Sequence, residues 1–367
     1  MKILSIIEAL GRGGAEVALA DLVAEMPEHR HVVWHFTSAN RLAINRNHVR
    51  RLSARGVRVR DVHWRAVVSP TLRDEMLEGF EPDVVVFHWW RNEPWAPWIA
   101  DALPSAKRPW FVCVLHSALS TVSSAYDRYV IVAELQRSLI HPAPDSEVWL
   151  IPNAVDGRRF RAASRASRSG PGEKFVIGSL ARLHPEKMPL DSISRAVAWD
   201  VPHAVWRFAG DGLLRAPFEA QAAAARSGEF HFVGHIARRA VPRFLSELDV
   251  LCHVVHPDTL DSNPIAVIEA LAAGVPVVAE ARGGLPDLIE DGTNGLLAAD
   301  LDEIGTLLSR LEADRGLVRR LSRGARESAV RFGRDEHVAA YRRLLAPLEA
   351  GPPPAASDAA IAAGAGA

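Results

Sequence analysis

The chain has 367 residues, of which 48% are hydrophobic and 24% charged, and this length predicts two or three domains. The composition excludes wholesale disorder and a collagen-like fibre, and a formal net charge of −1 gives no global attraction to nucleic acid. We find no run of 18 apolar residues and no signal-peptide pattern, so we expect no membrane-spanning helix. Two cysteines cannot form a disulfide framework, and we expect a cytoplasmic protein without a cysteine metal site.

Short apolar runs of strand length alternate with helical patterns through the first 150 residues. The helical patterns cover 15–26 and 41–55. Continuous apolar strands between helices predict an α/β domain, residues 1–155, whose parallel sheet is covered on both faces. The predicted strands are KILSII (2–7), HVVWHFT (31–37), VRVRDVHW (57–64), DVVVFHWW (83–90), WFVCVLH (110–116), YVIVA (129–133) and VWLIPN (148–153).

A polar segment separates this region from a second series of the same kind. Residues 156–172 are rich in Arg, Ser and Gly without periodicity, which predicts an interdomain linker. A second doubly wound domain should then cover 173–335, followed by a helix at 336–350 and a disordered Ala/Pro/Gly-rich tail at 351–367. Its predicted strands are KFVIGSLA (174–181), AVWRFAGDG (204–212), FHFVGHI (230–236), LDVLCHVV (248–255), VPVVAE (275–280) and GLLA (295–298).

Ligands of doubly wound sheets bind at the carboxyl ends of the strands, so we expect the chemistry in the loops that follow them. The first such loop is LGRGGAE, Leu10 to Glu16, whose backbone N–H groups could form an anion pocket. It is not the dinucleotide fingerprint, because Glu16 stands where the third glycine should be. NAD binding is therefore disfavoured, and a tight turn without a ligand remains the alternative.

The second loop is GSLARLHPEKM, Gly178 to Met188. Arg182 and Lys187 lie five positions apart across the turn at Pro185. Two cations at the end of a strand could clamp a diphosphate, because Arg offers a planar fork and Lys a point charge. A solvated charged loop is the alternative interpretation.

The third loop is DTLDSNPIAVIEALAAGVPVVAEARGG, residues 258–284. Ser262 or Asn263 can cap a helix, and Pro264 suits its first position. The free N–H groups at the helix start would form a phosphate cradle with the helix dipole behind it. They belong to Ile265, Ala266 and Val267.

Glu269 lies one turn further along the same helix, and it is either a carboxylate at the edge of the core or a ligand of sugar hydroxyls. His253 and His256 flank the loop and could support it from behind. Gly283 and Gly284 predict a second tight loop after the strand VPVVAE.

At this point the sequence resembles family 4 of the retaining glycosyltransferases, which have the GT-B fold. The likeness rests on the carboxylate-x7-carboxylate pair Asp261 and Glu269, followed by EALAAGVPVVA, GG and DGTNGLL. The GGAE loop, the R-x4-K pair, FAGDG, FVGHI and the LDVL strand fall in the same order as in that family. The resemblance covers roughly 1–345 and is strongest from 173 to 300.

The resemblance implies that the C-terminal domain holds a nucleotide-diphospho-sugar, without a metal or another cofactor. Arg182 and Lys187 would neutralise the diphosphate, and Asp261 would accept from hydroxyls of the donor sugar. The helix at 336–350 would pack back on the N-terminal domain. The other implied donor-site residues are Gly13 and Gly14 at the diphosphate, His116 near the sugar, Ser262, Asn263, Pro264, Ile265 and Ala266 in the donor loop, Glu269 at the ribose, and His235 and Ile236 at the base.

Some positions depart from the family pattern. Asp261 replaces the usual Glu and Ser262-Asn263 replaces the usual Gly-Phe, which bears on the choice of sugar. Met188 follows Lys187 where the family often has Gly.

The acceptor side has weaker signals. Its candidates are Glu16, His88 and Trp89, and the last two belong to an aromatic patch with Trp90, Trp95 and Trp98. The patch could stack on an acceptor ring or could cover the edge of a core. Eight arginines between residues 41 and 65 could touch anionic lipid or a phosphorylated acceptor, or could form a solvated basic helix.

These observations predict a metal-independent, retaining glycosyltransferase, with UDP favoured as the nucleotide and GDP open. The acceptor could be a small natural product, a cell-surface glycan or a lipid carrier, in a bacterium whose GC-rich genome is indicated by 39 Arg against 4 Lys. Two alternatives stay open: a sugar-nucleotide epimerase of the same fold, and a non-catalytic relative that binds nucleotide-sugars.

Overall fold

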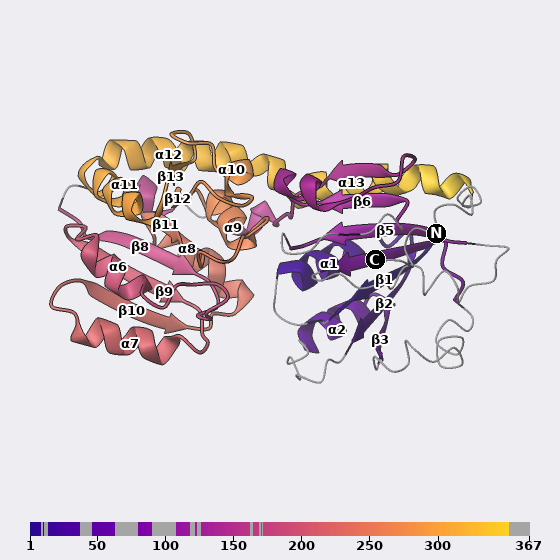
Figure 1. Ribbon diagram of the computed structural model, residues 1–367, viewed down its shortest axis with the longest axis horizontal. Coiled ribbons are helices and arrows are strands. Elements are labelled where there is room, and N and C mark those ends of the chain that lie inside the picture. The colour runs from indigo at the N-terminus through magenta and orange to yellow at the C-terminus, as the bar shows by residue number, and fades with distance from the viewer. Residues whose placement is uncertain are drawn as a thin grey trace. The chain divides into compact units, whose positions relative to one another are not determined.

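The computed structural model describes residues 1–8, 10, 14–36, 46–62, 80–89, 108–117, 122, 126–161, 164–168, 170 and 172–351. The side chains of residues 36, 46 and 89 are not described. The chain divides into two units, each built on one parallel sheet (Figure 1). Unit 1 comprises Met1–Pro152 and His337–Ala367, and unit 2 comprises Asn153–Glu336.

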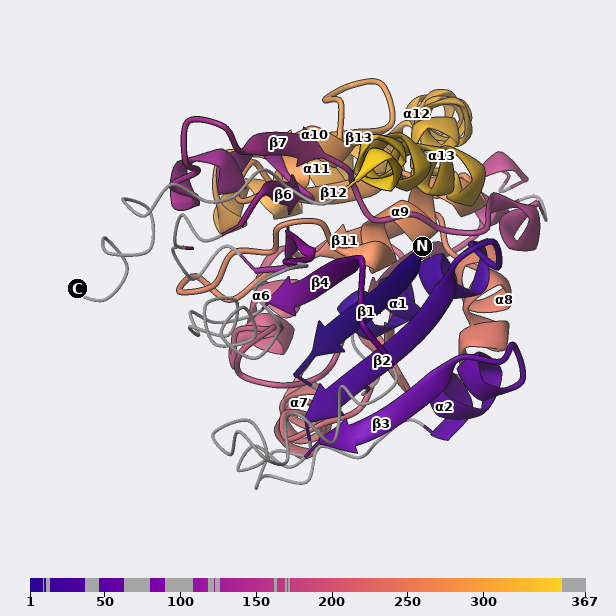
Figure 2. The same ribbon diagram turned by 90° about the vertical axis from the view of Figure 1, so that its right-hand side faces the viewer.

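Unit 1 contains a seven-stranded parallel sheet in the order β3-β2-β1-β4-β5-β6-β7. Figure 2 shows β3, β2, β1 and β4 side by side in this sequence. The strands are apolar on both faces because each face is covered: Leu4 and Ile6 pack into one core, while Ile3 and Ile7 pack into cores on the other side. The elements are β1 (Lys2–Ile7), α1 (Gly14–Ala24), β2 (Arg30–Phe36), α2 (Arg46–Ser53), β3 (Arg58–Val62), β4 (Val84–Trp89), β5 (Trp110–Leu115), β6 (Arg128–Ile131), β7 (Glu147–Leu150) and α13 (Arg334–Leu345).

Unit 2 contains a six-stranded parallel sheet in the order β10-β9-β8-β11-β12-β13. Ile177 of β8 belongs to a core that contains residues of α6, α7, α11 and α12, and its neighbour Val176 belongs to a second core that contains residues of α8 and α9. The elements are β8 (Phe175–Leu180), α6 (Ser192–Ala198), β9 (Ala204–Ala209), α7 (Arg215–Ala224), β10 (Glu229–Gly234), α8 (Val241–Ser246), β11 (Val250–His253), α9 (Ile265–Ala273), β12 (Val277–Glu280), α10 (Leu285–Leu288), β13 (Gly295–Ala298), α11 (Leu301–Ala313) and α12 (Arg315–Ser328).

The strand order reverses between β1 and β4 in unit 1 and between β8 and β11 in unit 2. Such a reversal opens a crevice at the carboxyl ends of the two strands, which is where doubly wound sheets bind ligands. The loops that leave β8 and β11 are those predicted to carry the donor-binding residues. Both loops are in the described part of the chain.

The segment 156–172 is not a free linker but belongs to unit 2. Two 3₁₀ helices, Gly157–Phe160 and Arg165–Ser167, anchor it there. Phe160 is buried in the core around α9, and Ser164 Oγ donates to the carbonyl of Gly274 at 3.0 Å. The polar composition misled the prediction because the partners of these residues lie about 110 positions away in the sequence.

The last helix packs on unit 1. α13 buries Val338, Tyr341 and Leu344 in a core that also contains Ile3 and Val84. It begins two residues before the predicted start and is followed by a 3₁₀ helix, Ala346–Ala350. The predicted disordered tail lies outside the described residues, apart from Gly351. None of the helices that the structure describes is long and apolar enough to cross a membrane.

Candidate functional site

Two loops meet at the reversal point of unit 2. β8 and β11 are neighbours, with Val250 opposite Ile177, so the loops that follow them leave the same edge of the sheet. The loop after β8 carries Arg182 and Lys187, and the loop from β11 to α9 carries Asp261. The backbone joins the loops directly, because His256 N–H donates to the carbonyl of Lys187 at 3.2 Å.

Asp261 is the centre of a charged cluster at this edge. Its Oδ1 accepts from Nζ of Lys187, and its Oδ2 lies 3.1 Å from Nε2 of His253. The Asp261 side chain is 13% exposed, and burial alone would raise the pKa of its carboxyl group. The hydrogen bond and charge of His253, together with the charge of Lys187, outweigh burial and hold this pKa well below its usual range. The carboxylate is therefore ionised and held from two sides.

The glycine pair after β12 shapes the backbone at Asp261. Gly284 N–H donates to the carbonyl of Asp261 at 2.9 Å. Gly283 has φ +61°, and a Cβ placed there would lie 2.6 Å from the same carbonyl oxygen. Arg282 Nη2 also donates to the carbonyls of Pro257 and Thr259, both at 2.6 Å. The predicted tight loop is thus a clamp on the donor loop.

The start of α9 differs in detail from the prediction. Pro264 is the N-cap residue and lies one position before the helix. The N–H of Val267 is not free, because it donates to the carbonyl of Pro264 at 3.1 Å. The helix start therefore offers a ligand the amides of Ile265 and Ala266, which have no acceptor within the helix.

No side chain caps α9, because the N-cap residue Pro264 has no hydrogen-bonding side chain and the side chain of Asn263 is engaged elsewhere. Asn263 Oδ1 accepts from Asn153 N–H at 2.8 Å, and Asn153 Nδ2 donates to the carbonyl of Asn263 at 2.9 Å. Sequence reasoning did not identify Asn153. Its position just after β7 gives no local sign of a partner 110 residues away.

The remaining residues of unit 2 that were predicted to bind the donor are placed separately. Glu269 is 7% exposed and lies on α9, about one turn after the first helical residue, Ile265. Arg182 is 60% exposed and contacts Glu186 at 3.9 Å, so the structure does not bring it into the Asp261 cluster. His235 is exposed just after β10, and Ile236 is half-buried against the core around α9.

The predicted residues of unit 1 are only partly described. Gly13, Trp90, Trp95 and Trp98 lie outside the described residues, as does the side chain of Trp89. Gly14 begins α1, and Glu16 is buried in its first turn.

His88 is 2% exposed, so it is not a surface residue that an acceptor could touch directly. Its Nδ1 lies 3.1 Å from Nε2 of His116. Burial lowers the pKa of His116 to about 3, with a further contribution from His337.

Part of the arginine-rich segment has a structural role. Arg51 pairs with Asp21 of α1, and Arg55 donates to the carbonyl of Ala24 at the end of that helix. These contacts hold α2 against α1. Residues 41–45 and 63–65 lie outside the described residues, and lipid or acceptor contact by the segment stays a prediction.

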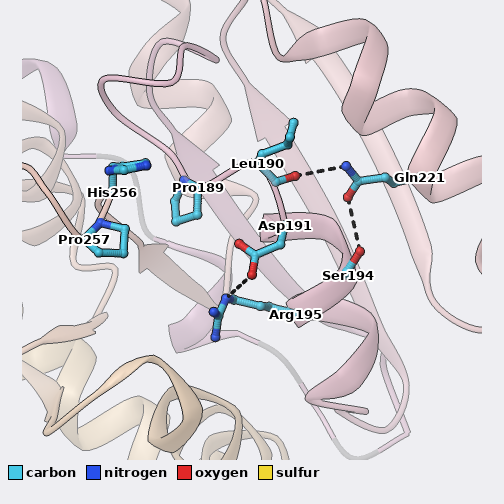
Figure 3. Close-up of a pocket in the computed structure, with 8 residues that line it drawn as sticks. All are labelled: Pro189, Leu190, Asp191, Ser194, Arg195, Gln221, His256 and Pro257. Carbon is cyan, nitrogen blue, oxygen red and sulfur yellow. Dashed lines mark hydrogen bonds and ion pairs between the residues drawn. The ribbon is translucent and has the colours of Figure 1, made fainter.

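A cavity of about 480 Å³ lies beside the predicted donor residues rather than on them (Figure 3). Figure 3 shows two pairs of polar side chains in its lining: Asp191 pairs with Arg195 at 2.8 Å, and Ser194 Oγ donates to Gln221 Oε1 at 3.3 Å. A second cavity, of about 10 Å³, adjoins Asp261. In the part of the chain that the structure describes, no three His, Cys, Asp or Glu side chains could hold a metal ion.

Comparison with known proteins relates most of the second unit to one family. Residues 160–328 match the family model described as glycosyl transferases group 1. A D-inositol 3-phosphate glycosyltransferase of Streptomyces bingchenggensis is 32% identical over 225 residues, 57% of this chain and 47% of that protein. A 2-deoxystreptamine N-acetyl-D-glucosaminyltransferase of Streptomyces fradiae is 33% identical over 186 residues, 49% of this chain and 42% of that protein. The chain thus spans about half the length of the curated relatives it matches.

Solved structures agree over nearly the whole chain. Anabaena Alr3699/HepE in complex with UDP has a TM-score of 0.74 at 20% identity, covering 95% of this chain and 100% of that one. Sucrose-phosphate synthase from Thermosynechococcus elongatus has a TM-score of 0.70 at 16% identity, with coverage of 95% and 100%. The two parallel-sheet units have the GT-B fold, as the sequence predicted.

Proposed function

We propose that this chain, which carries a group 1 glycosyltransferase domain at residues 160–328, transfers a sugar from a nucleotide-diphospho-sugar to an acceptor hydroxyl with retention of anomeric configuration. The observation that carries the proposal is the cluster of Lys187, Asp261 and His253 at the point where the strand order of unit 2 reverses. The start of α9 follows Asp261 by four residues, so charge and backbone amides lie in one loop system.

Lys187 and Arg182 would neutralise the diphosphate. Lys187 is 36% exposed, so its ammonium can contact a ligand while it is paired with Asp261. Among the residues that the structure describes, Arg182 is bound only by an exposed contact of 3.9 Å with Glu186, and such pairs contribute little. Moving the guanidinium to a phosphate would therefore require little free energy.

Glu269 would accept hydrogen bonds from the ribose hydroxyls, and Asp261 from hydroxyls of the donor sugar. His235 and Ile236 would meet the base. Solved neighbours in complex with UDP and with UDP-glucose support UDP as the first nucleotide to test, with GDP second. The donor-site roles of Gly13, Gly14 and His116 rest on the family resemblance alone.

The proposed chemistry is a front-face substitution. The bond from the anomeric carbon to the diphosphate oxygen breaks, and the acceptor oxygen bonds to the same face of that carbon. The acceptor proton passes to a diphosphate oxygen, so no protein nucleophile is needed. Lys187, Arg182 and the start of α9 would stabilise the negative charge that develops on the diphosphate, without a metal ion.

For the acceptor, we propose a small polyhydroxylated molecule of bacterial natural-product or cell-surface glycan biosynthesis. The names of the two relatives refer to D-inositol 3-phosphate and to 2-deoxystreptamine, which are both hydroxylated six-membered carbon rings. These two compounds are the first acceptors to test.

Nucleotide binding tests the proposal first. Nucleoside diphosphates and their sugars are screened by thermal shift, without metal and with EDTA. A ligand at 100 times its Kd should stabilise the fold by about 2.7 kcal/mol. Lys187→Ala should abolish the shift, whereas the exposed Lys174→Ala, at the opposite end of β8, should keep it. Absence of any nucleotide-induced shift in the wild type would refute the donor site.

Turnover then separates the classes of function. A glycosyltransferase yields a new glycoside whose anomeric configuration, read by NMR, equals that of the donor. A changed sugar on the nucleotide without an acceptor would instead identify an epimerase. Binding without turnover of any acceptor would favour a non-catalytic relative.

A further inference from the structure

Two imidazoles, the buried His88 and the half-buried His116, meet at the ends of neighbouring strands in unit 1. His88 is the second-last residue of β4 and lies opposite Val114 of β5. His116 follows the end of β5. Nδ1 of His88 lies 3.1 Å from Nε2 of His116. The ring planes differ by 14° and the ring centroids are 5.4 Å apart, which fits two rings joined edge to edge by an in-plane hydrogen bond.

Both rings are neutral near pH 7. Burial and the neighbouring His116 lower the pKa of His88 well below its ordinary value. Burial, aided by His337, lowers the pKa of His116 to about 3. Each neutral imidazole carries one N–H donor and one acceptor lone pair, so a single proton lies between the two nitrogens. That proton belongs either to Nδ1 of His88 or to Nε2 of His116.

The far nitrogen of His88 distinguishes these two arrangements. Nε2 of His88 is buried and has no hydrogen-bond partner in the described structure. If His116 were the donor, His88 would carry its proton on Nε2 and bury an unsatisfied N–H. If His88 is the donor, the Nε2 atom of His88 that has no partner in the described structure carries a lone pair rather than an N–H. Buried N–H groups without acceptors are rarer than unused acceptor lone pairs, so the second arrangement is favoured.

We propose that His88 is a positioning residue that donates from Nδ1 to Nε2 of His116 and thereby holds His116 in the Nδ1–H form. The second nitrogen of a histidine takes the state that the hydrogen bond of the first one imposes. Any ligand atom that meets Nδ1 of His116 must then be a hydrogen-bond acceptor, such as a hydroxyl or phosphate oxygen. The substrate role of His116 rests on the proposed function, but its protonation state does not.

The same arrangement restricts the chemistry of His116. Its only lone pair, on Nε2, is occupied by His88, so His116 has no basic nitrogen to offer an acceptor hydroxyl. It contributes a hydrogen bond from a neutral ring rather than proton transfer. This fits the front-face substitution, in which a diphosphate oxygen takes the acceptor proton.

NMR of the full chain with ¹⁵N-labelled histidine tests the protonation state directly. Long-range proton–nitrogen correlations at pH 7 show which ring nitrogen carries the proton, and the signals of His116 are assigned from their loss in His116→Asn. We expect a protonated Nδ1 and an unprotonated Nε2. A proton on Nε2, or on both nitrogens, would overturn the inference whether or not the protein transfers sugar.

Substitution of His88 tests its positioning role. His88→Asn places an amide N–H where Nδ1 was, so it should keep the Nδ1–H form of His116 and more activity than His88→Leu. By analogy with residues that orient metal-bound histidines, His88→Leu should lower kcat by about 10- to 100-fold. The exposed His231→Leu controls for loss of a histidine. Equal kcat for the Asn and Leu variants, with unchanged nitrogen signals of His116, would contradict the role.

Discussion

The glycine clamp on Asp261 allows a sharp test of the donor loop. Gly283→Ala should have two separate effects: a conformational cost of the backbone at residue 283 and a steric clash with the carbonyl oxygen of Asp261. Its φ of +61° costs a residue with a side chain about 1 to 2 kcal/mol. The new Cβ would also lie 2.6 Å from the carbonyl oxygen of Asp261, a separation that real Cβ atoms essentially never show, so the donor-loop backbone must move.

Gly292→Ala is the matched control. Gly292 has a similar φ, +74°, but a Cβ there meets no atom within 4 Å. Both variants should lose about 1 to 2 kcal/mol in free energy of unfolding from the backbone penalty. Only Gly283→Ala should also lose the 2.9 Å hydrogen bond from Gly284 to Asp261, worth about 1 kcal/mol, and thereby displace the carboxylate.

Urea unfolding gives the free energies, and titration calorimetry gives the Kd of the nucleotide-sugar. Gly283→Ala should weaken donor binding by about tenfold, which corresponds to about 1.4 kcal/mol, and Gly292→Ala should leave the Kd unchanged. If the two variants bind the donor equally well, the clamp does not position Asp261 and the reasoning fails.

Three further predictions concern the same groups. The lowered pKa of Asp261 contributes stability above its ordinary value of 3.8 that is lost as pH falls, so the advantage of the wild type over Asp261→Asn should shrink below pH 3.8 in urea unfolding; a constant difference would contradict the ion pair. His116 has a pKa of about 3 in the fold against 6.5 when unfolded, so the unfolded chain binds more protons between these values and stability decreases as pH falls; His116→Asn should flatten that decrease between pH 6.5 and pH 3, and equal slopes would show that the fold does not keep this ring neutral. Asn153→Ala removes the 2.9 Å bond to the carbonyl of Asn263, and Asn263→Ala removes the 2.8 Å bond from Asn153 N–H; each variant should lose about 1 kcal/mol in urea unfolding, and an unchanged free energy of unfolding in both would contradict these bonds.

The parallel strands were predictable because the chain buries both faces of each sheet. KILSII matches β1 at both ends, and GLLA matches β13, since an uninterrupted apolar run of strand length has few alternatives. The prediction of a free linker at 156–172 was wrong because the contacts that fix this segment are not local in the sequence. Phe160 is buried in the core around α9, and Ser164 bonds to Gly274 at the end of α9 and to Ser322 of α12. No local sequence pattern indicates these contacts.

The candidate site shows the same limit. Sequence spacing identified Lys187 and Asp261 as charges at strand ends, but their pairing joins residues 74 positions apart. His253 was visible only as a neighbour of the loop, and its contact with Asp261 depends on how the intervening residues fold back. His88 was assigned to the acceptor side from the tryptophans near it, whereas strand alternation turns its side chain into the interior.

The chain enters unit 2 after Pro152 and returns to unit 1 at His337, so unit 2 is an insertion within unit 1. Without α13, the sheet of unit 1 would expose the apolar face formed by Ile3, Val84 and Val112. A fragment that ends at Pro152 should therefore aggregate. In a chimera of two relatives, residues 153–336 should therefore be exchanged as one segment. The terminal helix should come from the same parent as the first 152 residues.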